Sequence, residues 1–356
     1  MSVSVVLVTG ATRFLGSELA GRLAGEPGVD QVIAVDAANP DPATVSRLGD
    51  ARFVRADIRN PLIAKVIETS GADTVVHASA SAPAGSASAR VLAKEMNVLG
   101  TMQLLAACQV APTVKNLVVR STAAVYGGSP RDPAVFTEET EPHALPSSGP
   151  ARDAADIEGY LRGFSRRRPD VRVAVARFAE IIGPSVRTPL TRYFSLTPTV
   201  PMLFGRDARV QFVHEQDAVE VMYRLTVGDW AGVVNVAGAG TMTVAQAIRR
   251  AGRVPVPLPG PVIGTVGRAL RAVSIGELRL GGFSPEQVQL LANGRSLDTS
   301  RLRDELGIQL RYSTEEAFAD FAATLPPVPG TDRVRAAEHW LLNAVGAGGT
   351  ERSGQQ

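Results

Sequence analysis

The N-terminal segment is the feature that most constrains the fold of this chain. Residues 5–16 read Val-Val-Leu-Val-Thr-Gly-Ala-Thr-Arg-Phe-Leu-Gly, an apolar stretch that leads into a glycine turn and then into a helical pattern. A second apolar stretch, residues 31–36, ends in Asp36. A strand, a glycine turn, a helix and a second strand that ends in an acidic residue together predict a βαβ unit of the kind that binds dinucleotides.

Strand and helix patterns alternate through the first two thirds of the chain. Apolar stretches predict buried parallel strands at 3–9, 31–36, 51–55, 73–78, 115–121 and 171–178. Helical patterns lie between them, at 15–25, 61–69, 90–109 and 151–167. This alternation predicts an α/β fold, namely a Rossmann-type doubly wound parallel sheet. The apolar stretch 233–237 is expected to join this sheet or a small cap.

Composition changes along the chain suggest three regions. We expect residues 1–180 to form an NAD(P)-binding Rossmann domain, to which residues 208–237 return. The pattern becomes irregular and richer in proline after about residue 180, so residues 181–325 are expected to form mostly a smaller C-terminal substrate-side region. Residues 326–356 are predicted to be a linker, a short helix and a disordered tail.

Overall composition excludes several classes of function. The chain has 356 residues with a net charge of +2, which gives no sign of nucleic-acid binding. The single cysteine, Cys108, excludes an internal disulfide and a thiolate metal cluster, and its apolar helical setting predicts burial; no metal site is expected. No stretch reaches the ~20 apolar residues of a transmembrane segment, and the first strand leaves no room for a signal peptide. We therefore expect a cytoplasmic protein.

The glycine turn predicts a seat for a pyrophosphate. Gly10 and Gly16 let the backbone approach closely, and the helix that begins near Phe14 and Leu15 offers free N–H groups and a partial positive charge. Arg13 stands where this pattern usually has another glycine. Its side chain must swing outward, or it adds positive charge beside the phosphates.

Acidic and small residues extend this predicted cofactor site. Asp36 can accept hydrogen bonds from a ribose hydroxyl and repels a 2′-phosphate, which favours NAD over NADP, although Arg13 acts in the opposite sense. Asp57 and Ile58 follow the third predicted strand, where an acidic group can reach the adenine. Small residues after the fourth strand would let a flat cofactor lie against the backbone; they are Ala78, Ser79 and Ala80.

These motifs, with several further ones, resemble the extended short-chain dehydrogenases/reductases of the NAD-dependent epimerase/dehydratase family, and in particular the UDP-glucose 4-epimerases. The order and spacing of the motifs over about residues 3–320 carry the resemblance. The further ones are Asn97-Val-Leu-Gly-Thr101, Ser121-Thr-Ala-Ala-Val-Tyr-Gly127, Arg177-Phe-Ala-Glu-Ile-Ile-Gly-Pro184, Phe212-Val-His-Glu-Gln-Asp217, Val234-Asn-Val-Ala-Gly238, and Asp298-Thr-Ser-Arg301 with Leu306-Gly307.

The resemblance implies roles for particular residues. Thr122 would lie beside the reacting alcohol, Asn97 would line the active-site side, and Ser121 and Ala78 would flank the nicotinamide. It also implies a nucleotide-sugar or other small-molecule ligand, and a homodimer that pairs through two helices of the α/β domain.

The catalytic pair of this family is missing from the sequence. The family uses Tyr-x-x-x-Lys, in which the tyrosine is the acid/base and the lysine favours its ionisation. Glu158 matches the glutamate that the family places four residues after the lysine, so Ala154 stands at the lysine position and Pro150 at the tyrosine position. None of the five tyrosines is followed four residues later by a lysine.

The substrate side departs from the family as well. Glu180 replaces a substrate-binding asparagine, and Val210 stands where an arginine for the diphosphate is expected, with Arg209 next to it. Glu180 and His214 are candidates for a displaced acid or base. Asp153 and Asp156 are also carboxylates near the vacated pair, but a solvated acid at a helix N-terminus is the simpler interpretation of them.

Three hypotheses follow. The first is an NAD-binding sensor, scaffold or regulatory protein without the usual hydride chemistry. The second is an active epimerase, dehydratase or reductase that uses Thr122 with a non-standard acid/base. The third and weakest is a membrane-surface interaction through residues 262–274, for which an ordinary amphipathic helix is the simpler interpretation.

Overall fold

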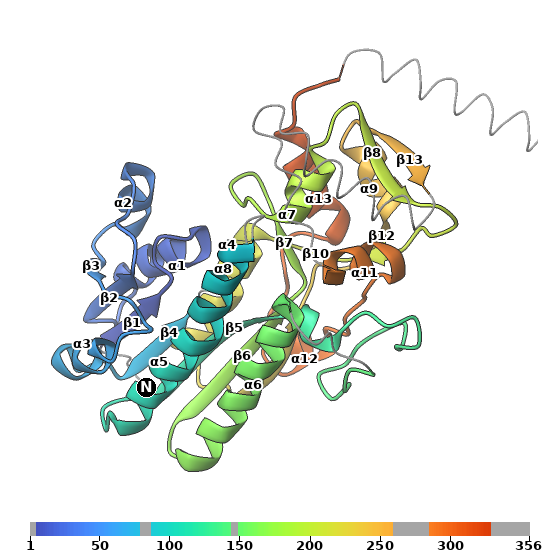
Figure 1. Cartoon of the computed structure of the whole chain (residues 1–356). Coiled ribbons are helices and arrows are strands. Elements are labelled where there is room, and N and C mark those ends of the chain that lie inside the picture. Colours follow the sequence, from blue (N-terminus) through green and yellow to red (C-terminus); the bar gives the residue numbers. More distant parts are fainter. Residues whose placement is uncertain (1–4, 79–86, 144–148, 259–284, 329–356) are drawn as a thin grey trace, which may run out of the picture.

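The computed structural model describes residues 5–78, 87–143, 149–258 and 285–328 (Figure 1). Its centre is a seven-stranded sheet in the order β11-β6-β5-β4-β1-β2-β3, in which every neighbouring pair is parallel. The strands are β1 (Val5–Thr9), β2 (Gln31–Asp36), β3 (Arg52–Arg55), β4 (Thr74–His77), β5 (Asn116–Thr122), β6 (Arg172–Phe178) and β11 (Gly232–Val236).

Apolar residues on both faces of these strands explain why the sheet is covered on both sides. Along β1, Val6 and Val8 pack into one core while Leu7 packs into the other, because side chains alternate along a strand. Helices α1 (Phe14–Ala24) and α8 (Glu215–Val227) close the first core. Helices on the opposite face close the second; they are α3 (Leu62–Ser70), α5 (Gly100–Val110) and α6 (Pro150–Arg167). Figure 1 shows α5 and α6 side by side.

A smaller region stands at one end of the sheet, at the upper right in Figure 1. Its strands pair as β7 (Glu180–Ile182) with β10 (Phe212–His214), β8 (Thr199–Leu203) with β13 (Val254–Leu258), and β9 (Arg209–Val210) with β12 (Met242–Thr243). An aromatic core holds these short pairs together, with Phe194, Phe212 and Phe318 in mutual ring contact. The remaining described helices are α2 (Pro42–Leu48), α4 (Ala87–Lys94), α7 (Pro189–Phe194), α9 (Val244–Arg250), α11 (Pro285–Asn293), α12 (Ser300–Asp304) and α13 (Thr314–Ala323).

Two helical turns of other types complete the element order. Between α4 and α5 lies the π-helical turn η1 (Glu95–Leu99), and after β5 comes the 3-10 turn η2 (Ala123–Tyr126). A π-helical turn inside a helix often marks a functional site. Here η1 brings Asn97 into the buried interior beside the carboxyl edge of the sheet.

The predicted doubly wound parallel sheet is confirmed, and its six N-terminal strands begin and end within two residues of their predicted bounds. The chain returns to the sheet through α8 and β11, so residues 215–236 lie with the N-terminal part. Cys108 is fully buried, as predicted, and burial raises the pKa of its thiol to about 12. The predictions for 262–274 and for the segment after residue 328 lie outside the described residues.

Candidate functional site

The order of the strands locates a binding crevice. In the sheet β1 lies between β2 and β4, and the helices that follow β1 and β4 cover opposite faces. Ligands of open α/β sheets bind outside the carboxyl ends of the strands where this change of side occurs. Predicted cofactor residues lie at these strand ends, since Gly10 follows β1, Asp36 ends β2 and Ala78 follows β4.

Glycines shape the turn between β1 and α1. Gly10 has a φ of +77°, a left-handed conformation that favours glycine. A Cβ on Gly16 would lie 2.3 Å from the carbonyl oxygen of Gly10, far closer than any real contact. The backbone at the start of α1 therefore lies directly against the turn, and no larger residue fits at position 16.

The first turn of α1 presents free backbone donors. The amides of Phe14, Leu15 and Gly16 have no partner among the described residues, and Arg13, the N-cap, gives no side-chain cap. Arg13 itself is exposed, so its side chain does not fill the space in front of these amides. Three unpartnered N–H groups at the positive end of a helix form a seat for an anion such as a pyrophosphate.

Asp36 lies beside this turn and can accept one more hydrogen bond than it receives from the protein. Its Oδ2 accepts hydrogen bonds from the backbone N (3.0 Å) and the hydroxyl (2.7 Å) of Thr12, while Oδ1 accepts one from Ala38 N (3.2 Å). A carboxylate has about four acceptor sites, so one remains for a ribose hydroxyl. Asp57 is instead engaged with Arg59, whose hydrogen bond lowers the pKa of that carboxyl, and Ile58 is buried.

His77 closes the crevice at the end of β4. Its Nδ1 lies 2.7 Å from the Thr9 hydroxyl and its Nε2 lies 2.9 Å from the Thr101 hydroxyl. Burial, and then the charge of Arg120, lower the pKa of His77 to about 4, so the ring is neutral at neutral pH. Ala78 is buried next to it, whereas Ser79 and Ala80 lie outside the described residues.

A buried polar network connects α6 to the sheet. Glu158 on α6 accepts hydrogen bonds from Ser121 Oγ (2.6 Å) and from Arg177 Nη2 (2.6 Å). Arg177 also donates to the Tyr126 hydroxyl (2.9 Å), which in turn donates to Asn235 Oδ1 (2.7 Å). The hydroxyl of Ser121 is therefore already used within the protein and faces α6.

Pro150 and Ala154, where the resemblance predicts the acid/base pair of the family, lie at the start of α6. Pro150 is the first residue of the helix, where a missing N–H costs nothing. Ala154 is 8% exposed and packs in an apolar cluster with Tyr126 and Phe136. Neither side chain can move a proton.

No other tyrosine takes over this role. Tyr126 is the nearest, but burial raises its pKa and both Arg177 and Asn235 engage its hydroxyl. Burial also raises the pKa of Tyr193, whose hydroxyl donates to Pro201 O (2.7 Å). The remaining three lie elsewhere: Tyr160 is exposed, Tyr223 donates to Glu26, and Tyr312 stacks on His214.

The three lysines are equally remote from this function. Lys65 lies on α3 and Lys94 ends α4, and both are exposed. Lys115 precedes β5 at the amino edge of the sheet and lies 4.0 Å from Asp170. Thus no tyrosine and lysine come together in a pair here.

Thr122 and Glu180 lie on the side of the crevice that faces the smaller region. Thr122 ends β5, and its Oγ1 accepts a hydrogen bond from Ala124 N (3.2 Å) while its own proton stays available. Burial raises the pKa of the Glu180 carboxyl, and the guanidinium groups of Arg295 and Arg120 offset part of that rise. Glu180 was identified from the sequence but both arginines were missed, although Arg120 directly follows the apolar residues Leu117-Val-Val119 of β5.

The other candidate acids and bases have structural partners. His214 caps α8 by accepting from Gln216 N (3.2 Å), and its Nε2 lies 2.9 Å from Asp320 Oδ2. Asp156 pairs with Arg152 at 3.0 Å, one turn away on α6. The expectation of a solvated acid is wrong for Asp153, which is only 2% exposed in the same helix. This geometry favours a structural role for His214 and for Asp156.

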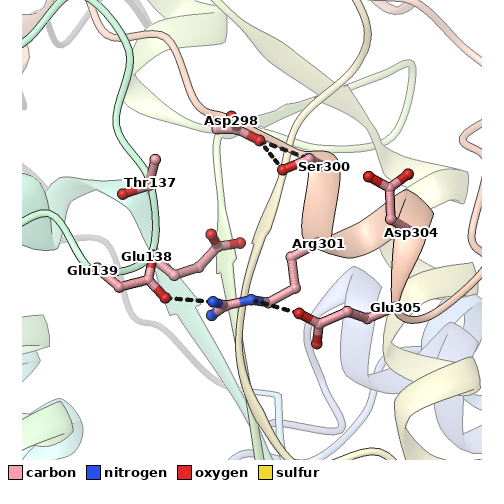
Figure 2. A pocket seen from close by; sticks show the side chains of 8 residues that line it. All are labelled: Thr137, Glu138, Glu139, Asp298, Ser300, Arg301, Asp304 and Glu305. Carbon is pink, nitrogen blue, oxygen red and sulfur yellow. Dashed lines mark hydrogen bonds and ion pairs between the residues drawn. The ribbon is translucent and has the colours of Figure 1, made fainter.

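An acidic pocket of about 200 Å³ lies where α12 meets the segment after Phe136 (Figure 2). Arg301 forms ion pairs there with Glu139 and with Glu305, and Asp298 accepts a hydrogen bond from the backbone N of Ser300, the first residue of α12. The pocket has no part of the dinucleotide crevice in its lining.

The described ranges contain neither a membrane-spanning helix nor a cluster of metal ligands. In them no helix has both the length and the apolar composition needed to cross a bilayer. In the same ranges no three His, Cys, Asp or Glu side chains gather in a way that could hold a metal ion.

Comparisons with known proteins agree with this architecture. Residues 6–237 match the model of the NAD dependent epimerase/dehydratase family. An uncharacterized protein of Mycobacterium tuberculosis is 48% identical over 344 residues, which are 96% of this chain and 89% of that protein.

Solved structures share the fold at low sequence identity. A dTDP-glucose 4,6-dehydratase of Bacillus anthracis, in complex with NAD, has a TM-score of 0.67 at 19% identity and covers 90% of this chain and 96% of its own. A UDP-glucose 4-epimerase of Thermotoga maritima, with UDP-glucose, has a TM-score of 0.67 at 20% identity and covers 90% and 98%.

Proposed function

The chain belongs to the NAD-dependent epimerase/dehydratase family of extended short-chain dehydrogenases/reductases, and we propose that it binds NAD without the tyrosine–lysine proton relay of that family. Its bound cofactor would then serve a sensing, scaffolding or regulatory role. Support comes from the contrast between the free backbone amides and Asp36 at the glycine turn and the two side chains, Pro150 and Ala154, that cannot move a proton at the start of α6.

The residues of the crevice fit NAD. The free amides of Phe14, Leu15 and Gly16 would hold the pyrophosphate, and the spare acceptor site of Asp36 would take a ribose hydroxyl. A 2′-phosphate would meet the negative charge of Asp36, which favours NAD over NADP. When bound, the nicotinamide supplies hydride acceptance, and this chain supplies its orientation.

The observation that carries the proposal is the environment of Ala154. Ala154 is 8% exposed and belongs to the same apolar cluster as Tyr126 and Phe136, so position 154 itself offers no cation and no proton donor. Loss of one general acid/base typically costs about 10²–10⁴-fold in rate, and here its helper is missing too.

Glu180 supports a second candidate function, that of an active epimerase, dehydratase or reductase. Burial raises the pKa of Glu180, so this carboxyl keeps its proton to a higher pH than an ordinary carboxyl does. A protonated Glu180 could donate to a ligand oxygen held near Thr122. This alternative predicts that Glu180→Gln abolishes turnover while NAD binding remains.

The ligand and the assembly extend the proposal. The family resemblance favours a nucleotide sugar or a similar small molecule in front of Thr122. The adjoining helices α5 and α6, with η1 between α4 and α5, expose Leu99, Met102 and Tyr160, each at least 40% exposed. An apolar face of this kind would be covered if two copies paired through these helices.

Native mass spectrometry with titrated NAD and NADP tests the proposal. We expect one NAD per chain and a weaker response to NADP. Gly16→Ala should abolish binding because its Cβ would meet the Gly10 carbonyl. Gly25→Ala, whose Cβ would lie 3.8 Å from the Arg22 carbonyl oxygen, should bind NAD as the unchanged protein does. Absence of any dinucleotide complex in the folded protein would refute the proposal.

A further inference from the structure

Arg120 is a charged side chain that makes no hydrogen bond or ion pair with the part of the chain that the structure describes. It lies on β5, two residues before Thr122. Its Nε is fully covered and unsatisfied. The residue as a whole is half-buried, so its terminal nitrogens stay accessible to a ligand. Covering part of a guanidinium without a partner is costly, so a group beyond the described residues is expected to pair with it.

Arg295 approaches the same place from the other end of the sequence. Its backbone bridges to Val210, and its Nη2 donates to the carbonyl of Gly127, which follows the turn after β5. The residue is 9% exposed, and its Nε also lacks a partner within the described chain. A second buried guanidinium therefore has donors to spare.

Glu180, the first residue of β7, completes the cluster. Glu180 pairs with Phe212 of β10, two residues from Val210, to which Arg295 bridges. The negative charge of Glu180 favours the charged form of both guanidinium groups, yet among the described residues no ion pair joins it to either. Three charged groups that converge without closing on one another leave donors and an acceptor open between them. This arrangement suits a ligand that bridges them.

We propose that Arg120, Glu180 and Arg295 bind a small-molecule ligand that carries a carboxylate next to a hydroxyl group. The planar donors of the two arginines match a carboxylate, and the oxygens of Glu180 accept from the neighbouring hydroxyl. The inference rests on the proposed function, because it names the class of ligand that would lie in front of the NAD.

The location favours a carboxylate at the reacting end of the ligand. Arg120 and Thr122 project from the same face of β5, because side chains repeat every two residues along a strand. Arg120 also influences His77 at the cofactor crevice. The cluster therefore lies beside Thr122, the position that the family resemblance gives to the reacting alcohol.

Charge balance adds a signature to the binding. Asp132 is a further negative group near Arg295, so these four side chains sum to zero charge while Glu180 is ionised. His77 and Tyr126 are the other titratable groups that act on the two arginines. An entering carboxylate is accommodated best if Glu180 takes up a proton, so binding should consume protons from the buffer.

Isothermal titration of the NAD-loaded full chain provides the test, with UDP-glucuronic acid and UDP-glucose as a matched pair and with UDP and free glucuronate as further arms. We expect the acid to bind about tenfold or more tightly than UDP-glucose, with proton uptake for the acid alone. Proton uptake is measured by repeating the titration in buffers of different ionisation enthalpy.

Variants give changes of opposite sign. Arg120→Met should remove the preference for the acid, whereas Glu180→Gln should strengthen acid binding and eliminate proton uptake. Arg311→Met, at an exposed arginine without a side-chain partner in the described chain, is the control and should change nothing. Arg295 is buried, so its substitution can disturb the fold. A variant at this position is therefore interpreted only if it still binds NAD.

The outcomes separate this proposal from the proposed function. Equal binding of UDP-glucose and the acid, or an Arg120→Met effect on UDP as large as on the acid, would overturn it, because the arginines would then not read a carboxylate. Failure of the unchanged protein to bind either acid would overturn it too. In each case native mass spectrometry measures NAD binding independently, so failure of this proposal is distinguished from failure of the proposed function.

Discussion

The guanidinium of Arg177 on β6 donates hydrogen bonds to both carboxylate oxygens of Glu158 on α6. Its Nε lies 3.0 Å from Oε1 and 3.2 Å from Oε2, and its Nη2 lies 2.6 Å from Oε2. Both side chains are nearly inaccessible to solvent. This pair fixes α6 against the sheet and thereby sets where Pro150 and Ala154 lie. On the proposed function, this ion pair keeps the position of α6 although the proton-moving side chains of the family are replaced by Pro150 and Ala154.

Removing one member of this pair should destabilise the whole domain. Glu158→Gln leaves the Arg177 charge buried without its partner, and we expect a loss of roughly 3–5 kcal/mol in the free energy of unfolding. Urea denaturation measures the loss. The control is Glu68→Gln on the exposed face of α3, which should stay within about 0.5 kcal/mol. Equal stability of both variants would show that the buried pair does not hold α6.

A lysine should not be tolerated at position 154. Ala154 packs against Tyr126 and Phe136, so Ala154→Lys overpacks this cluster and buries a charge, with an expected cost of roughly 1–3 kcal/mol from overpacking alone. Ala155→Lys, one position along the same helix and less buried, should cost far less. Thermal unfolding compares the two. If Ala154→Lys melts with the parent protein, the site has retained room for the family's lysine.

His77 should make the fold sensitive to acid. Burial lowers its folded-state pKa from the ordinary 6.5 to about 4, so the unfolded chain binds this proton more tightly. Its contribution to stability is complete above pH 6.5 and falls as the pH drops toward about 4, by roughly 2 kcal/mol between pH 7 and pH 5.

Denaturation of His77→Gln at these two pH values checks this expectation. The variant should lose less stability than the parent between pH 7 and pH 5, while His143→Gln, at an exposed histidine, should follow the parent. A parent and a His77 variant with the same pH dependence would mean that the ring already takes its proton in the folded state.

Asp36 should determine both the shape of the glycine turn and the choice of cofactor. Asp36→Ala removes the acceptor of Thr12 and the negative charge, so NAD affinity should fall about tenfold or more while the disadvantage of NADP shrinks. Cofactor titration followed by native mass spectrometry measures both. Asp30→Ala, an exposed neighbour before β2, serves as the control. An unchanged ratio of NAD to NADP binding would remove Asp36 from the site.

The sheet was predictable because its strands are apolar on both faces. Each strand is therefore a continuous apolar run in the sequence, which can be recognised without knowing which strands it pairs with. The return of residues 208–237 to the N-terminal domain was predicted, but the helix α8 within them was not, because it starts with Glu215-Gln-Asp217 inside an irregular, proline-rich region. Its contact with α1 shows which face of the sheet it covers. The glycine turn and Asp36 were predictable from local spacing.

The charged cluster was only partly predictable. Glu180 stood out because it occupies a motif position, but Arg120 and Arg295 come from distant parts of the chain and share no local pattern with it. Their meeting depends on the pairing of β5 with β6 and on the bridge between Val210 and Arg295. Such a convergence is a property of topology and cannot be read from spacing.

Turnover by the NAD-loaded protein is the most direct test of the central claim, that the cofactor is held without a proton relay beside it. Purified protein is mixed with NAD and a panel of sugar nucleotides, including UDP-glucose and UDP-glucuronic acid, and NADH absorbance and product epimers are followed. We expect bound NAD and no reaction above background. Turnover within the ordinary enzymatic range of about 1–10³ s⁻¹ would contradict the claim.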